Sequence, residues 1–179
     1  MKSNQNISTG VAFGVIIGLA YCILLFIRWQ SADNFIQFGI LAVVNYLLVI
    51  GVLFYEASYR RKLNGGYIEM KELMQTLFIS VLIFELFYSI FNFIYLKYID
   101  PNVIDSMKQT MRQMLNKAGD QVSDEQRKEA MARFDSLGEA TQIGQVIKGY
   151  FTSIATSGVV ALIISAIMRK RKPIFQEIS

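Results

Sequence analysis

The sequence predicts an all-α fold, an integral membrane four-helix bundle with a helical extracytoplasmic segment between its third and fourth spans. Hydrophobic residues make up 53% of the 179 residues, and the mean hydropathy of +0.36 is too high for an ordinary soluble domain. The apolar residues fall in four runs of membrane-spanning length. Between the last two runs the chain becomes polar. We therefore expect a single membrane domain over residues 1–179.

The predicted spans follow the four apolar runs. Arg28 and Trp29 end the first run, and tryptophan is suited to the membrane interface. A cleaved signal peptide is the alternative for this run, but Gln30-Ser31-Ala32 is a poor cleavage site, so we expect a retained span. Asp100-Pro101 ends the third run. The spans are expected at about 11–27, 35–55, 74–96 and 149–168.

Residues 100–145 are expected to form an amphipathic helical insertion. Apolar residues recur there at spacings of three and four, which is typical of a helix with one buried face. They are Val103, Ile104, Met107, Met111, Met114 and Leu115. A capping-box pattern over Ser123–Gln126 predicts a second helix, which ends near Gly138. We expect the two helices to pack on each other and on the bilayer surface. A dedicated partner-binding face is the alternative.

The distribution of charge predicts the orientation. Four spans place both termini and the segment after the second span on one side, which carries nine basic and four acidic residues. Residues 97–148 carry eight of each. Basic residues beside a span stay in the cytoplasm, so we expect cytoplasmic N- and C-termini, with the segment between the third and fourth spans outside. The orienting clusters are Arg60, Arg61 and Lys62, and Arg169, Lys170, Arg171 and Lys172.

A sharp turn is expected after the first basic cluster, at Asn64, Gly65, Gly66 and Tyr67. Glycine adopts positive φ without steric cost, so Asn-Gly-Gly lets the chain reverse direction.

Small residues at four-residue spacing predict where the spans pack closely. The first span has Gly10, Gly14 and Gly18, and the fourth has Ser153, Ser157 and Ala161. We expect these two rows to pack helices together, with mutual contact between the rows as one arrangement. The alternative is that one row forms a homodimer.

Glu85 is the only carboxylate inside the predicted spans, and it is the twelfth of 23 residues in the third span. Tyr88 and Asn92 share its helical face. Asn45 is the eleventh of 21 residues in the second span, so it is expected at the same depth. A charge in hydrocarbon is costly, so Glu85 should face the bundle, hydrogen-bonded and protonated. A structural hydrogen bond and a proton or cation site are the two hypotheses for this polar cluster.

The composition argues against several classes of function. The chain has no histidine and one cysteine, Cys22, which removes the commonest metal ligand and any intrachain disulfide. No catalytic or phosphate-binding pattern is present, so we expect no enzyme activity, no metal and no cofactor. The net charge of +4 is local, which argues against nucleic acid as a partner.

The stretch Arg61–Ile68, the aromatic span after it, the balanced amphipathic segment and the ending Leu162–Pro173 resemble a known family. It is the Bacteroidota membrane-protein family known as domain of unknown function 4199. The resemblance covers nearly the whole chain and implies an inner-membrane protein with four spans. It implies no activity and no catalytic residues.

Two hypotheses for function follow. The first is an accessory, structural or assembly component that binds itself or a membrane-protein partner. The second is a small oligomeric transporter or channel component that uses Glu85 as an intramembrane acidic site. Transporters often carry internal repeats, and none is visible in this sequence.

Overall fold

The computed structural model describes residues 2–118, 123–138 and 141–170, and every regular element in these ranges is a helix. The all-α prediction is therefore confirmed. In chain order the elements are α1 (Lys2–Gln30), α2 (Phe35–Leu63), α3 (Met70–Ile94) with a π-helical turn over Tyr95–Ile99, α4 (Val103–Ala118), α5 (Asp124–Gly138) and α6 (Ile143–Met168). Within the described ranges, four helices are long and apolar enough to cross a membrane: Asn4–Gln30, Phe35–Leu63, Met70–Ile99 and Ile143–Met168.

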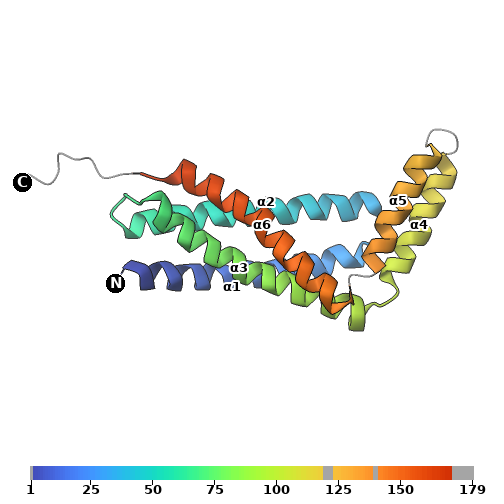
Figure 1. Ribbon diagram of the computed structural model, residues 1–179, viewed down its shortest axis with the longest axis horizontal. Helices are drawn as coiled ribbons and strands as arrows, with labels where there is room; N and C mark the ends of the chain where they lie inside the picture. Colours follow the sequence, from blue (N-terminus) through green and yellow to red (C-terminus); the bar gives the residue numbers. More distant parts are fainter. Residues whose placement is uncertain (1, 119–122, 139–140, 171–179) are drawn as a thin grey trace, which may run out of the picture.

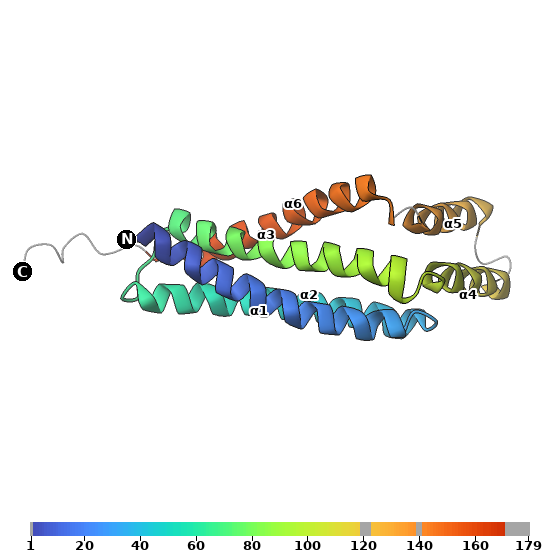
Figure 2. The ribbon, with the colours of Figure 1, turned by 90° about the horizontal axis from the view of Figure 1, so that it is seen from below.

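The four long helices α1, α2, α3 and α6 run along one another as a bundle (Figures 1 and 2). The start of α1, the α2–α3 turn and the end of α6 lie at one end of this bundle. The α1–α2 turn and the α4–α5 pair lie at the other end. This is the arrangement that four successive crossings of a membrane require.

The helices are longer than the apolar runs, and the difference matters most in α2. This helix continues to Leu63, eight residues beyond the predicted end of the span, so Arg60, Arg61 and Lys62 belong to its last turn and the expected turn begins at Asn64. Basic residues stabilise the C-terminal turn of a helix, where unpaired carbonyl groups carry partial negative charge. Hydropathy alone therefore placed the end of this helix too early.

The turn after α2 has the geometry that Asn-Gly-Gly favours. Gly65 and Gly66 have φ values of 70° and 87°. The Gly66 N–H donates to the Arg61 carbonyl at 2.9 Å, and the Gly65 N–H donates to the Lys62 carbonyl at 3.1 Å. This pair of bonds is the Schellman motif, which satisfies the last carbonyl groups of the helix.

A short antiparallel bridge ties the α2–α3 turn to the end of α6. The Ile68 N–H donates to the Lys170 carbonyl at 2.8 Å, and the Lys170 N–H donates back to the Ile68 carbonyl at 3.0 Å. The bridge holds the end of the fourth span beside the turn between the second and third. Arg169 and Lys170 are thereby brought to the same end of the bundle as the basic last turn of α2.

Helix α3 is the centre of the bundle, because α1 and α6 both pack mainly on it. One apolar core joins α1, α2, α3 and α6, with Leu53, Leu73, Leu77 and Val81 fully buried. A second, aromatic core lies at the end that carries α4. There Trp29 stacks on Tyr95 with ring centroids 5.7 Å apart.

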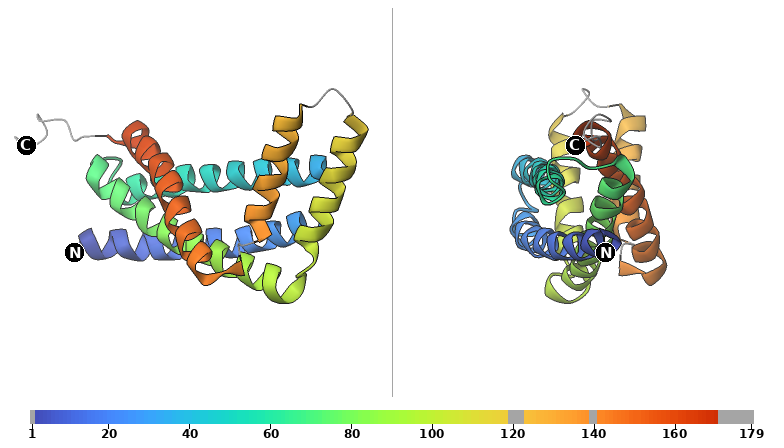
Figure 3. Two further views of the ribbon diagram at one scale, coloured as in Figure 1. Left: turned by 45° about the vertical axis from the view of Figure 1, so that its right-hand side comes forward. Right: turned by 90° about the vertical axis from the view of Figure 1, so that its left-hand side faces the viewer.

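The α4–α5 pair stands across the end of the bundle (Figures 1 and 3). Val103, Ile104 and Met107, at the start of α4, are buried in the aromatic core. The predicted capping box opens α5: the Ser123 N–H donates to Gln126 Oε1 at 3.1 Å, and the Gln126 N–H donates to Ser123 Oγ at 3.3 Å. Because the buried residues in the described part of α4 are Val103, Ile104 and Met107, only the first turns of this helix are anchored in the bundle.

Candidate functional site

Glu85 lies inside the bundle, 5% exposed, in the middle of α3. The hydroxyl of Ser157, on α6, donates a hydrogen bond to Glu85 Oε1 at 2.5 Å. The carboxyl group thus faces the neighbouring helix instead of lipid, as expected for an acid within a span. Its partner comes from the small-residue row of the fourth span.

A cavity of about 240 Å³ borders Glu85, and each of the four spans contributes to its lining. Every residue of this lining carries a hydroxyl or carboxyl group. They are Tyr21, Tyr46, Glu85, Tyr88, Thr152, Ser153, Thr156 and Ser157. The rings of Tyr21 and Tyr88 stack with their centroids 5.3 Å apart. Residues of all four spans therefore surround a polar site, at the depth where a membrane is most apolar.

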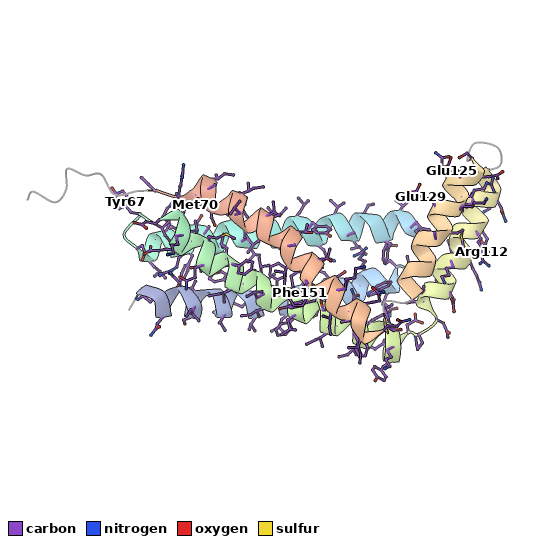
Figure 4. All side chains as sticks on the ribbon, in the orientation of Figure 1. Tyr67, Met70, Arg112, Glu125, Glu129 and Phe151 are labelled. Carbon is purple, nitrogen blue, oxygen red and sulfur yellow. The ribbon has the colours of Figure 1, made fainter. Side chains whose placement is uncertain are left out.

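The Glu85 cavity opens on the outer face of the bundle, between α2 and α6. Tyr46 of α2 is 62% exposed, and Thr152 and Thr156 of α6 are exposed as well. Phe151, labelled in Figure 4, lies in the same exposed segment of α6. The rim of the cavity is thus built from residues of α2 and α6.

A second cavity of about 270 Å³ adjoins the first and shares Tyr88 and Ser153 with it. It lies between α3 and the first half of α6, toward the end that carries α4. Its other lining residues are Ser89, Asn92, Phe93, Leu96, Gln145, Val146, Gly149 and Tyr150. The two cavities together follow the α3–α6 contact from the end of the bundle to Glu85.

The predicted polar cluster is only partly brought together. Tyr88 lines both cavities, and Asn92 lines the second, where its Oδ1 accepts a hydrogen bond from Trp29 Nε1 at 2.8 Å. Asn45 is buried, but it does not line the Glu85 cavity. Its side-chain amide has no hydrogen-bond partner within the described part of the chain. Equal depth in two helices did not bring Asn45 onto Glu85, because depth does not determine which way a side chain points.

A second buried polar network was missed by the sequence reasoning. Glu56, placed outside the spans in the prediction, is fully buried in α2, and Ser80 of α3 donates to its Oε1 at 2.6 Å. One turn later Arg60 is also fully buried, and it donates from Nε to Asn6 Oδ1 of α1 at 2.8 Å. Glu85 is therefore not the only carboxyl group within the spans. The four-residue spacing of Glu56 and Arg60 was the signal for a shared helical face.

The position of Arg60 corrects its expected role as a surface charge. Its neighbours Arg61 and Lys62 are half-buried and exposed, and Arg169 and Lys170 are exposed. Lys170 Nζ lies 5.5 Å from the centre of the Tyr67 ring. Arg171 and Lys172 lie outside the described residues. The positive surface at this end of the bundle thus excludes Arg60, which belongs to the interior.

The small-residue rows both face α3, so the suggestion that they pack on each other is wrong. A Cβ on Gly10 would lie 2.6 Å from the Thr76 carbonyl oxygen. One on Gly14 would lie 2.8 Å from Ile83 Cβ, and one on Gly18 would lie 2.7 Å from Phe87 Cγ. On α6, Ser157 bonds Glu85 and Ala161 is fully buried. The glycine row is therefore closed within the chain and is not available for a homodimer.

The described residues contain no group of three or more His, Cys, Asp or Glu side chains able to hold a metal ion. A single carboxyl group surrounded by hydroxyl groups can bind a cation, accept or release a proton, or hydrogen-bond a polar ligand. These are the chemical possibilities that the site offers.

The model of a family described as "Protein of unknown function (DUF4199)" matches residues 9–170. No curated protein matches the chain, and no solved structure does.

Proposed function

The chain belongs to the DUF4199 family, whose description carries no activity, so we propose its function from its own site. We propose a non-catalytic accessory or assembly component of the bacterial inner membrane. In this proposal the protein binds a membrane-spanning helix of a partner protein through the face between α2 and α6. A second copy of the chain is the alternative partner.

The proposed orientation has both termini in the cytoplasm. It is supported by the basic residues Arg61, Lys62, Arg169 and Lys170, which lie where the α2–α3 turn meets the end of α6. The opposite end carries α4 and α5, in a segment with balanced charge. Basic residues are retained on the cytoplasmic side of a membrane.

One observation carries the proposed binding role: the polar cavity around Glu85 opens on the outer face of the bundle. Tyr46, Thr152 and Thr156 form its rim. Polar surface that faces hydrocarbon costs free energy unless another polar group covers it. A partner helix with a hydrogen-bonding side chain at this depth would cover the rim, and polar contacts of this kind stabilise helix association in membranes.

The test uses a photocrosslinking amino acid at Tyr46, with Tyr55 as the matched control. Both tyrosines are on α2 and are 62% and 64% exposed, but only Tyr46 lines the cavity. We expect a crosslink from position 46 to another membrane protein and little from position 55. Native mass measurement in nanodiscs should then show a complex of fixed composition.

Two outcomes would contradict this proposal. A crosslink at position 46 to a second copy of the chain alone would replace the partner protein by a homo-oligomer. Equal crosslinking at both positions, without a complex of fixed composition, would remove the accessory role.

A transporter or channel component is the second candidate function. It is favoured by the two adjoining cavities, which follow α3 and α6 as far as Glu85. If it is correct, purified protein in liposomes dissipates an ion gradient, and Glu85→Gln abolishes the flux. Ser165→Ala is the control, because Ser165 is buried on α6 away from both cavities. Liposomes without flux would leave the accessory role as the better account.

A further inference from the structure

We propose that the cavity around Glu85 is a binding site for a small organic cation, a protonated primary amine, within the membrane. This proposal goes beyond the accessory role. It rests on the lining of the cavity and holds with or without a partner protein.

The cavity is lined by one carboxyl group and by no basic side chain. Glu85 supplies that carboxyl group, and tyrosine, threonine and serine supply the rest of the lining. Without a countercharge Glu85 stays protonated at this depth, because hydrocarbon does not solvate a carboxylate, and it ionises when a cation binds beside it. Since no lysine or arginine lines the cavity, a bound cation would supply that charge.

The hydroxyl groups of the α6 wall are arranged as hydrogen-bond acceptors. Thr152 donates its proton to the Lys148 carbonyl at 2.9 Å, and Thr156 donates to the Thr152 carbonyl at 3.1 Å. Ser157 donates to Glu85. A hydroxyl has a single proton, so these three oxygens can only accept a further bond. A protonated primary amine has three N–H donors and matches this wall, whereas a quaternary ammonium ion has none.

The size of the cavity favours a small molecule over a metal ion or a drug-sized ligand. Its volume is about 240 Å³, and one water occupies about 30 Å³ in the liquid. The cavity therefore has room for a small molecule of a few non-hydrogen atoms. Sites for drug-sized ligands begin at about 300 Å³, and a divalent metal ion would find only one carboxylate in the lining.

The tyrosines add a second attraction for a cation. Tyr21, Tyr46 and Tyr88 all border the cavity, and aromatic faces attract ammonium groups. Tyr46 lies at the rim, where its ring is 62% exposed. The adjoining cavity along α3 and α6 offers a route from the end of the bundle to this position.

The experiment measures ligand binding by thermal unfolding in nanodiscs, followed by circular dichroism. Propylammonium chloride is compared with tetramethylammonium chloride and sodium chloride at equal concentrations. We expect a saturable rise in Tm with propylammonium only, because a ligand that binds the folded state stabilises it. Glu85→Gln should abolish the rise, and Ser165→Ala, away from the cavity on the same helix, should keep it.

If Glu85→Gln does not fold, Tyr46→Leu provides a second variant for the same measurement. Tyr46 is exposed, so its replacement leaves the core intact. It should raise the propylammonium concentration at half-effect about 2- to 5-fold, from the loss of one exposed cation–π contact. The proposal is overturned by an absent Tm rise, by an equal rise with sodium or tetramethylammonium, or by a full rise in Glu85→Gln. None of these outcomes depends on a partner protein.

Discussion

Glu56 and Glu85 are each held by one serine of a neighbouring helix, but their surroundings differ. Ser80 lies 2.6 Å from Glu56, and the same hydroxyl lies 2.8 Å from the Gly10 carbonyl. A hydroxyl has one proton, so Ser80 donates to one of these two acceptors at a time. Glu56 is fully enclosed, whereas Glu85 borders a cavity. Glu56 therefore ties helices together, and Glu85 has access to a ligand.

Replacement of Arg60 tests whether this residue belongs to the interior. We expect Arg60→Ala to lower the free energy of unfolding by about 2–3 kcal/mol, because it removes charge-assisted hydrogen bonds to buried Asn6. Lys62→Ala, in the same turn but exposed, should change it by less than about 0.5 kcal/mol. Denaturation in mixed micelles measures both values. Equal effects would mean that Arg60 serves only as a surface charge.

Alanine replacements of two glycines test the packing of α1 on α3. In Gly14→Ala the new Cβ would lie 2.8 Å from Ile83 Cβ, so we expect a loss of about 1–3 kcal/mol from overpacking. Gly51→Ala adds the same atom where nothing lies within 4 Å. It should stabilise its helix by about 0.5–1 kcal/mol. The sign of the change in Tm distinguishes the two sites, and a stabilising Gly14→Ala would contradict the close approach.

At the scale of elements, α6 divides into two parts. Its second half is closely packed on the core through Ala161, Ile164 and Ser165, and the bridge to Ile68 fixes its end. Its first half borders the two cavities at Gly149 and Ser153. Movement that admits a ligand is therefore expected in the first half of α6, with the second half as the fixed point.

Helix α4 carries one apolar stripe, but only its start is buried. Met107 is 3% exposed and Met114 is 46% exposed. We expect Met107→Ala to cost about 2–5 kcal/mol through the cavity that it leaves in the aromatic core. Met114→Ala should cost less than about 0.5 kcal/mol. Thermal unfolding of the two variants measures the difference, and equal costs would show that the whole of α4 is anchored.

At the scale of the whole molecule, the two ends of the bundle carry different charge. The turn after α2 and the end of α6 meet at the basic end through the Ile68–Lys170 bridge. The α4–α5 pair stands across the other end (Figure 3). The bridge thus brings the exposed residues Lys62, Arg169 and Lys170 to one end of the bundle, and basic residues at one end favour one orientation in the membrane.

Cysteine labelling tests this orientation in intact cells. In a Cys22→Ser background, we expect a membrane-impermeant maleimide to label Asn116→Cys, on exposed α4, without permeabilisation. Lys62→Cys, exposed at the end of α2, should be labelled only after the membrane is opened. The reverse pattern would invert the topology. Labelling of both sites in intact cells would show that the chain does not cross the membrane as four spans.

The sequence by itself determined the features that depend on neighbouring residues. Apolar runs of sufficient length predicted the four spans, Asn64-Gly65-Gly66 predicted the turn with positive φ, and Ser123–Gln126 predicted the start of α5. The burial of Glu85 also followed, because a carboxyl group in hydrocarbon must turn inward. Each of these inferences needs only local geometry or the properties of the solvent.

Only the tertiary structure decided which faces meet. It joined Glu85 to Ser157 instead of Asn45, closed the glycine row of α1 on α3, and buried Arg60 beside Asn6. Hydropathy places a residue along the membrane normal but says nothing about rotation of a helix around its own axis. That rotation is set by the packing of side chains from distant parts of the chain, and it is what gathers groups from four spans around one cavity.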